Sequence, residues 1–250
     1  MKRILVRADD LGFSEGVNYG ILKTVKEGII RSVGLMTNME ATQHGVDLLK
    51  GMDVCMGLHT NICVGKPLAD PSLIPSLIGE NGEFKSSKIY RSAKEDFVNL
   101  DEVLIEIEAQ YLKFVELMGY KPHYFEGHAI MSEKFFEGMQ MIAQKYGCEY
   151  LPAGFDGPVN FRNTVLHTCL DSMFPNYDPV ASLKKYAAKD YGTDGMCMFV
   201  CHPGYLDAYL LRKSSLLEPR TLEVEMCTSD EVKAWLKENQ ISVVTYDDLT

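Results

Sequence analysis

The 250-residue sequence predicts an α/β fold whose parallel sheet closes into a barrel, and three observations support this. Short apolar runs alternate with amphipathic stretches, which is typical of repeated strand–helix units. No internal repeat, low-complexity tract or linker interrupts the pattern, so one domain is expected over 1–250. Polar residues of the metal-binding and acid–base kinds follow several strands. A barrel brings all such strand ends to one mouth, whereas an open sheet gathers only those near its switch point.

The strands and helices are assigned from apolar periodicity and capping residues. The expected strands cover 3–8, 32–38, 54–61, 123–128, 149–154, 196–204 and 241–249. The expected helices run from the cap Ser14 to Gly28, from Asp101 to Gly119, from Glu133 to Tyr146 and onward from the cap Ser229.

A polar segment that contains glycine and proline, from about 65 to 99, interrupts this rhythm. Loops of this length without regular structure are usually functional or disordered, so we expect it to cover a substrate groove. Its Phe84 and Tyr90 are candidate faces for stacking a sugar ring. The alternative is a solvated insertion that packs on the flank of the barrel.

Composition restricts the partners. The formal net charge of −10 argues against nucleic acid or an anionic membrane surface and favours a neutral or cationic small molecule. The seven cysteines include no Cys-x-x-Cys pair, so a zinc ribbon is not expected. A reducing, cytoplasmic location is the simplest expectation. The N-terminal apolar run is too short for a signal peptide, and no stretch reaches transmembrane length.

Three strand-end residues form a candidate metal site. Asp10, His59 and His128 offer one carboxylate oxygen and two imidazole nitrogens, which suit zinc, cobalt, manganese or magnesium with positions left for water. Neighbouring side chains on an extended backbone diverge, so Asp9 would face the water and act as general base.

Each of these signals is weak alone. An Asp-Asp pair before glycine is often a turn or cap, and a strand-end histidine is often only hydrogen-bonded. The prediction depends on four strand ends with compatible chemistry, the fourth ending at His202. His44, His123 and His167 receive no role.

The ordered segments "ADDLGFSEGVNYGI", "SVGLMTNM", "MGLHTNICVGKPL", "HYFEGH" and "VCHPGY" resemble the signature segments of the YdjC-like carbohydrate deacetylases, which include chitooligosaccharide deacetylases. The C-terminal segment is similar as well, so the resemblance runs from about residue 3 to 249. It implies a distorted (β/α) TIM-like barrel, a divalent metal cation (Mg²⁺ or Zn²⁺) and hydrolysis of N-acetyl groups on amino sugars such as diacetylchitobiose.

By motif match, Asp10, His59 and His128 fall on the metal-ligand positions of that family, and Asp9 falls on the neighbouring aspartate, its expected base. His202 or another acid would protonate the leaving amine.

The sequence departs from the family in three respects. Arg7 stands where asparagine is usual, Glu126 replaces an aspartate, and "EGHAIMS" keeps one histidine of a histidine-rich stretch. Arg7 and Glu126 are expected to contact the substrate. Two alternatives stay open: another metal-dependent sugar or phosphate hydrolase, which Arg7 favours, and an inactive sugar-binding protein. The expected partner is a small carbohydrate, and the chain could form a homodimer.

Overall fold

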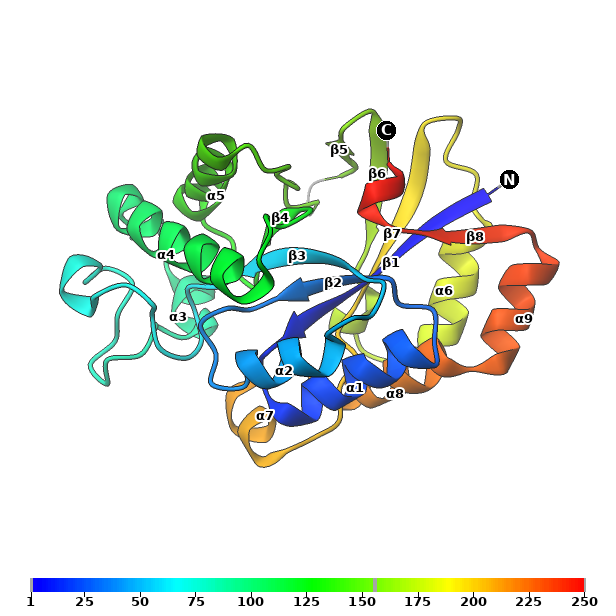
Figure 1. The fold of residues 1–250 in the computed structure, drawn as a ribbon, viewed down its shortest axis with the longest axis horizontal. Helices are drawn as coiled ribbons and strands as arrows, with labels where there is room; N and C mark the ends of the chain where they lie inside the picture. The colour runs from blue at the N-terminus through cyan, green and yellow to red at the C-terminus, as the bar shows by residue number, and fades with distance from the viewer. Residues whose placement is uncertain (1, 155–156, 250) are drawn as a thin grey trace.

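The computed structural model in Figure 1 describes residues 2–154 and 157–249. Its strands are β1 (Lys2–Leu11), β2 (Ser32–Leu35), β3 (Cys55–Thr60), β4 (Phe125–Gly127), β5 (Val159–Phe161), β6 (Thr164–Cys169), β7 (Gly195–Cys201) and β8 (Ile241–Val244). Its α-helices are α1 (Glu15–Lys26), α2 (Thr42–Leu49), α3 (Ser87–Ser92), α4 (Leu100–Met118), α5 (Glu133–Tyr146), α6 (Pro179–Ala188), α7 (Ala208–Lys213), α8 (Glu218–Thr228) and α9 (Asp230–Glu238).

The strands form one curled sheet in the order β4-β3-β2-β1-β7-β6-β5, parallel except between β5 and β6. The long strand β1 lies at its centre and shares one edge between two partners: its first residues pair with β8, and its last with β2. Figure 1 shows the sheet as a half-barrel with helices outside it. The α/β barrel-like fold predicted from the sequence is therefore confirmed. Within the described residues, no strand pairing joins β5 back to β4.

Side-chain alternation along β1 explains where the site forms. Ile4, Val6 and Ala8 belong to the core between the sheet and its helices, whereas Leu5 belongs to a second core inside the curl. Arg7 and Asp9 occupy the next positions on the inner face. The interior therefore changes from apolar to charged as β1 approaches its carboxyl end.

The sequence-based assignments need three corrections. Residues 149–154 do not form a strand; only Tyr150 makes an isolated bridge, to Phe125 of β4. The segment 65–99 is not structureless, because it contains a 3-10 turn (Pro71–Leu73) and α3. The elements β5, β6, α2, α6, α7 and α8 were not predicted, because most of them are short and lie among polar residues. In the described part of the chain, none of the helices is long and apolar enough to cross a membrane.

Candidate active site

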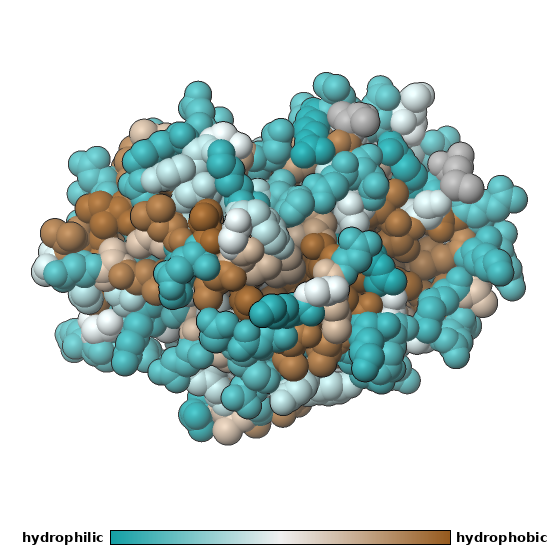
Figure 2. Space-filling model, viewed as in Figure 1, coloured by the Kyte–Doolittle hydropathy of each residue, from teal (hydrophilic) through white to brown (hydrophobic). Residues whose placement is uncertain are grey.

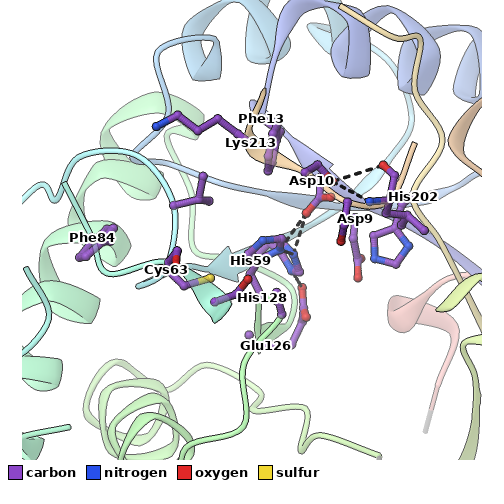
Figure 3. Close-up of a pocket in the computed structure, with 18 of the residues that line it drawn as sticks. Asp9, Asp10, Phe13, His59, Cys63, Phe84, Glu126, His128, His202 and Lys213 are labelled. Carbon is purple, nitrogen blue, oxygen red and sulfur yellow. Dashed lines mark hydrogen bonds and ion pairs between the residues drawn. The ribbon is translucent and has the colours of Figure 1, made fainter. Parts of the chain in front are cut away.

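A pocket of about 680 Å³ opens at the carboxyl ends of the parallel strands (Figure 3). All the residues predicted to form the site line it, although they come from β1, β3, β4 and the end of β7. They are Arg7, Asp9, Asp10, His59, Glu126, His128 and His202.

A β-bulge brings both aspartates into this pocket. The register between β1 and β2 shifts between Ala8 and Leu11, and Asp10 has a φ of 73°. On a regular strand, Asp9 and Asp10 would point to opposite faces. The left-handed conformation of Asp10 breaks that alternation, so the two carboxylates reach the same pocket by different routes. The two side chains were predicted to diverge on an extended backbone; in the structure a local bend at Asp10 directs both of them into the pocket.

Three donor atoms converge on one point. Asp10 Oδ1 lies 3.1 Å from His59 Nε2 and 3.0 Å from His128 Nδ1, and the two nitrogens are 3.0 Å apart. A ring of three such contacts cannot be satisfied by the protons of two neutral imidazoles and a carboxylate. It is the spacing expected of neighbouring ligands around one divalent cation about 2.1 Å from each. The three residues therefore fit a divalent metal.

Glu126 sets the orientation of His59. Its Oε1 accepts a hydrogen bond from His59 Nδ1, so the lone pair of Nε2 faces Asp10 and His128. A carboxylate behind a histidine is the usual support of a metal-ligating imidazole. Burial would lower the pKa of His59, but the charges of Glu126 and Asp9 raise it well above its ordinary value.

Gly34 of β2 makes room for this arrangement. A Cβ atom at Gly34 would lie 3.1 Å from both Glu126 Oε1 and the Cβ atom of His59, and 3.4 Å from Asp9 Oδ1. A side chain there would push against all three groups.

Arg7 is held entirely by protein groups. Its Nη2 donates to Asp9 Oδ2 at 2.7 Å and lies 3.4 Å from Glu126 Oε2, and its Nη1 donates to the Tyr246 hydroxyl at 3.0 Å. Its Nε is 2.6 Å from Asp9 Oδ1, an ion pair in which the N–H is not aligned as a hydrogen bond. Burial would lower the pKa of Arg7, yet Asp9 and Glu126 raise it well above its usual value. Arg7 therefore compensates the charge of Asp9.

Asp10 has a different cationic partner, Arg220 of α8. Arg220 Nη2 donates to Asp10 Oδ2 at 2.7 Å, and Arg220 is buried. Burial would raise the pKa of Asp10, but the charges of His128 and Arg220 lower it well below its ordinary value. Sequence reasoning missed Arg220, which lies 210 positions from Asp10. Arg220 shares the buried side of α8 with Glu223, Val224 and Cys227, and no local pattern marks its partner.

His202 follows β7 and is held through its backbone. Its N–H donates to Glu223 Oε2 at 2.6 Å, and its carbonyl accepts from Arg220 at 3.4 Å. Its Nδ1 is buried and has no hydrogen-bond partner in the described structure. Burial lowers the pKa of His202 to about 4, so the ring is neutral at neutral pH. Burial raises the pKa of Glu223 to about 8, against the hydrogen bonds that it accepts from His202 and Tyr177.

The opposite wall of the pocket comes largely from the segment 65–99. Phe84 and Tyr90, the candidate sugar-stacking faces, are both buried in the core; Phe84 borders the pocket, and the Tyr90 hydroxyl donates to the Ile62 carbonyl at 2.8 Å. Glu83 crosses the mouth to Lys213 of α7 in a 2.7 Å ion pair. The covering role predicted for this segment agrees with its place over the pocket.

A second set of donor atoms, from Asp9, His59 and Glu126, lies within the same cluster. Both carboxylates of this set are paired with Arg7, whereas Asp10 directs one oxygen to Arg220 and the other to the two histidines. The set of Asp10, His59 and His128 is therefore the one with donor atoms available to a cation.

Fold and site together define a class: α/β barrel-like proteins with carboxylate and imidazole donors converging at the strand ends. The chain belongs to the YdjC-like protein family, whose model matches residues 3–238. The family resemblance seen in the sequence is thereby confirmed.

Curated relatives align over nearly their whole length. Carbohydrate deacetylase 2 of Listeria innocua is 30% identical over 99% of this chain and 98% of that protein. The chitooligosaccharide deacetylase of Serratia marcescens is 31% identical over 99% of each chain.

Solved structures share the fold. A protein from Enterococcus faecalis, described as a candidate cellobiose-phosphate cleavage protein, superposes with a TM-score of 0.83 at 23% identity over 98% of both chains. A family 4 acetyl xylan esterase from Clostridium thermocellum, in complex with cobalt, superposes with a TM-score of 0.54 at 12% identity over 99% of this chain and 89% of that one.

Proposed function

We propose that this protein is a metal-dependent hydrolase that removes N-acetyl groups from amino sugars. The observation that carries the proposal is the triangle of donor atoms from Asp10, His59 and His128, with Asp9 beside it in the same pocket. The names of the relatives, carbohydrate and chitooligosaccharide deacetylase, support the reaction type. The cobalt in the structurally similar esterase supports the use of a divalent cation.

Asp10, His59 and His128 would hold the cation. When bound, it supplies a lowered pKa for water and polarisation of the acetyl carbonyl. Two imidazole nitrogens and one carboxylate oxygen suit Zn²⁺ better than Mg²⁺, which prefers oxygen ligands. Glu126 keeps His59 in the tautomer that points Nε2 at the site, and Arg220 keeps Asp10 ionised.

Asp9 accepts the proton of the attacking water. Arg7 holds the Asp9 carboxylate through Nε and Nη2, so its position is fixed before substrate binds. We therefore assign Arg7 to positioning the base as well as to the predicted substrate contact. Glu126, fixed between Arg7 and His59, is placed in the same supporting group.

His202 delivers a proton to the leaving amine. Because its ring is neutral at neutral pH, that proton must reach it during turnover. The charges of Asp10 and Asp9 both raise the pKa of His202, so both favour its protonated form. Acetate and a free amino sugar are the products.

The substrate class that we favour is a chitooligosaccharide such as diacetylchitobiose, bound by a single domain spanning 1–250. The pocket volume lies in the range of small-molecule sites. The alternative function, phosphate hydrolysis, required an Arg7 that is free to bind phosphate. The Arg7 guanidinium is instead paired with Asp9, Glu126 and Tyr246, so this alternative is less favoured. A homodimer and a cytoplasmic location remain predictions.

The test is acetate release from N-acetylated chito-oligomers by the metal-free protein and by protein refilled with Zn²⁺ or Mg²⁺. We expect activity only after refilling, and expect His59→Ala to lose one equivalent of bound metal together with its activity. His44→Ala, which changes a histidine that does not line the pocket, is the control and should keep both. Full activity in the presence of a chelator, or wild-type metal content in His59→Ala, would refute the proposal.

A further inference from the structure

Three side chains with metal-ligating chemistry also meet at the other end of the sheet. Cys55 is the first residue of β3, four positions and about 13 Å before His59. His123 precedes β4, and Asp247 lies in the 3-10 turn after β8 (Tyr246–Asp248). One donor atom from each of the three lies within 4.8 Å of the other two. None of the three lines the active-site pocket.

The backbone fixes each of these residues. The Cys55 N–H donates to the Arg31 carbonyl at 2.8 Å, and the His123 N–H donates to the Met56 carbonyl at 2.9 Å. The turn that carries Asp247 is closed by hydrogen bonds from the backbone and hydroxyl of Thr245 to Asp248. The cluster is thus preformed by the sheet and the C-terminal turn.

The site is closed on one side and open on the other. Cys55 is 4% exposed, whereas the side chains of His123 and Asp247 are 34% and 46% exposed. His123 Nδ1 lies 2.7 Å from Asp247 Oδ1, so the imidazole and carboxylate already face one another. A cation from solvent would meet the exposed pair first and then the buried sulfur.

The surroundings of the sulfur suit a bound thiolate. Burial and then the charge of Asp247 raise the pKa of the Cys55 thiol to about 12, although backbone hydrogen bonds from Tyr246 and Asp247 act in the opposite direction. A thiol with so high a pKa is not a nucleophile at neutral pH. A divalent cation would offset both the burial and the neighbouring carboxylate, and it deprotonates a coordinating thiol outright.

We propose that Cys55, His123 and Asp247 form a second metal site, which takes a cation of the zinc class. Thiolate, imidazole and carboxylate form a mixed set that Zn²⁺ accepts and that Mg²⁺ and Ca²⁺ do not favour. Binding releases the thiol proton to solvent and leaves a fourth position for water. The cation would join the start of β3, the approach to β4 and the C-terminal turn. Strands β3 and β4 pair with each other, but among the described residues no strand pairing joins either of them to the C-terminal turn.

The competing interpretation is an ion pair between His123 and Asp247 beside an unrelated buried thiol. Titration of the metal-free protein with Co²⁺ distinguishes the two, because a cobalt–thiolate bond absorbs in the near ultraviolet and cobalt bound only by nitrogen and oxygen does not. We expect this absorption to reach its maximum after one equivalent has bound to the cysteine site. Cys55→Ser should abolish it.

Cys63→Ser is the matched control, because Cys63 is also 4% exposed but lies in the active-site pocket. It should keep the absorption, and His59→Ala should keep it while binding one equivalent less in total. Absence of the absorption in the wild type, or its persistence in Cys55→Ser, would overturn the proposal. Its loss in Cys63→Ser would place the thiolate in the active site instead and would overturn it too.

A milder variant guards against misfolding. His123→Gln changes a partly exposed side chain and should fold normally, yet it removes a nitrogen ligand. We expect its affinity for Co²⁺ at the cysteine site to fall at least about tenfold. Unchanged affinity would refute a role for His123.

Discussion

Two walls of the pocket are built in different ways. The strand-end wall carries Asp9, Asp10, His59 and Glu126 on β1, β3 and β4 of one sheet, and its charges are buried and paired. The wall contributed by 65–99 is held partly by bonds within the segment, from the Phe84 N–H to the Gly65 carbonyl and from Lys85 Nζ to the Ser76 carbonyl. Its base is anchored where the Leu68 and Ala69 N–H groups donate to the buried Glu106, and its edge at the mouth is joined to α7 by the ion pair between Glu83 and Lys213.

This difference suggests that the strand-end wall performs the chemistry and that the wall formed by 65–99 controls substrate entry. Buried ion pairs are costly to break, so the strand-end wall is held in one arrangement before substrate arrives. Ion pairs near the surface contribute little to stability, so the wall formed by 65–99 can move when a sugar enters. Figure 2 shows apolar and charged side chains intermixed over the surface of this region, whereas Figure 3 shows the charged groups of the strand-end wall gathered at one place. Substitutions in the two walls should therefore have effects of different size.

The largest effect is expected from Asp9→Asn. The change keeps the shape of the side chain and removes the base, so kcat should fall about 10²–10⁴-fold with metal affinity nearly unchanged. Asp10→Asn should instead weaken metal binding, with activity partly restored by excess metal. Metal titration and steady-state rates check both. If Asp9→Asn loses the metal and Asp10→Asn does not, the two roles are reversed.

Arg220→Met tests whether the strand-end wall depends on its long-range ion pair. It leaves the buried Asp10 carboxylate without its arginine, which should cost about 3–5 kcal/mol of unfolding free energy in metal-free protein. Added divalent metal should restore part of the loss, because it supplies positive charge to the same carboxylate. Denaturant unfolding with and without metal is the measurement. Arg212→Met, at an exposed arginine of α7, is the control, and an equal loss there would contradict the comparison.

Glu223 makes the support of His202 sensitive to pH. Its pKa is raised from 4.5 to about 8, so between these values the folded state keeps a proton that the unfolded state has released. Stability from this group is therefore complete below about pH 4.5 and is lost as pH rises through about 8, by up to about 1.4 kcal/mol per pH unit.

Glu223→Gln should remove this pH dependence while keeping an acceptor for the Tyr177 hydroxyl. The measurement is the unfolding free energy of both proteins from pH 5 to 8. Because glutamine resembles the protonated carboxyl group, the two curves should lie closest at pH 5 and separate as the wild type loses stability towards pH 8. Parallel curves would show that Glu223 does not titrate there.

The smallest effect is expected across the mouth. Lys213→Met and Glu83→Gln each break the partly exposed ion pair between α7 and the segment 65–99. The free energy of unfolding should change by less than about 1 kcal/mol. KM should change more than kcat, because the pair lies at the entrance and does not contact Asp9 or Asp10. A loss of kcat as large as that of Asp9→Asn would mean that both walls take part in the chemistry.

The local pattern of the sequence was enough for the fold class, for most strands and for the helices α1, α4, α5 and α9. Apolar runs such as that of β1 and capping residues such as Ser14 and Gly119 act within a few positions, so they can be read directly. The same pattern predicted that Asp10, His59, His128 and His202 would meet, because the carboxyl ends of parallel strands share one side of a sheet.

Only the tertiary structure decided how the charges of the site are compensated. The adjacent aspartates have separate arginine partners. Asp9 pairs with Arg7, two positions away, and Asp10 pairs with Arg220, which lies 210 positions away on α8. The bulge at Asp10, the support of His59 by Glu126 and the meeting of Cys55, His123 and Asp247 likewise depend on segments far apart in the chain. Periodicity specifies which face of an element is buried, but the partner that a buried polar group finds there is determined by how the elements pack.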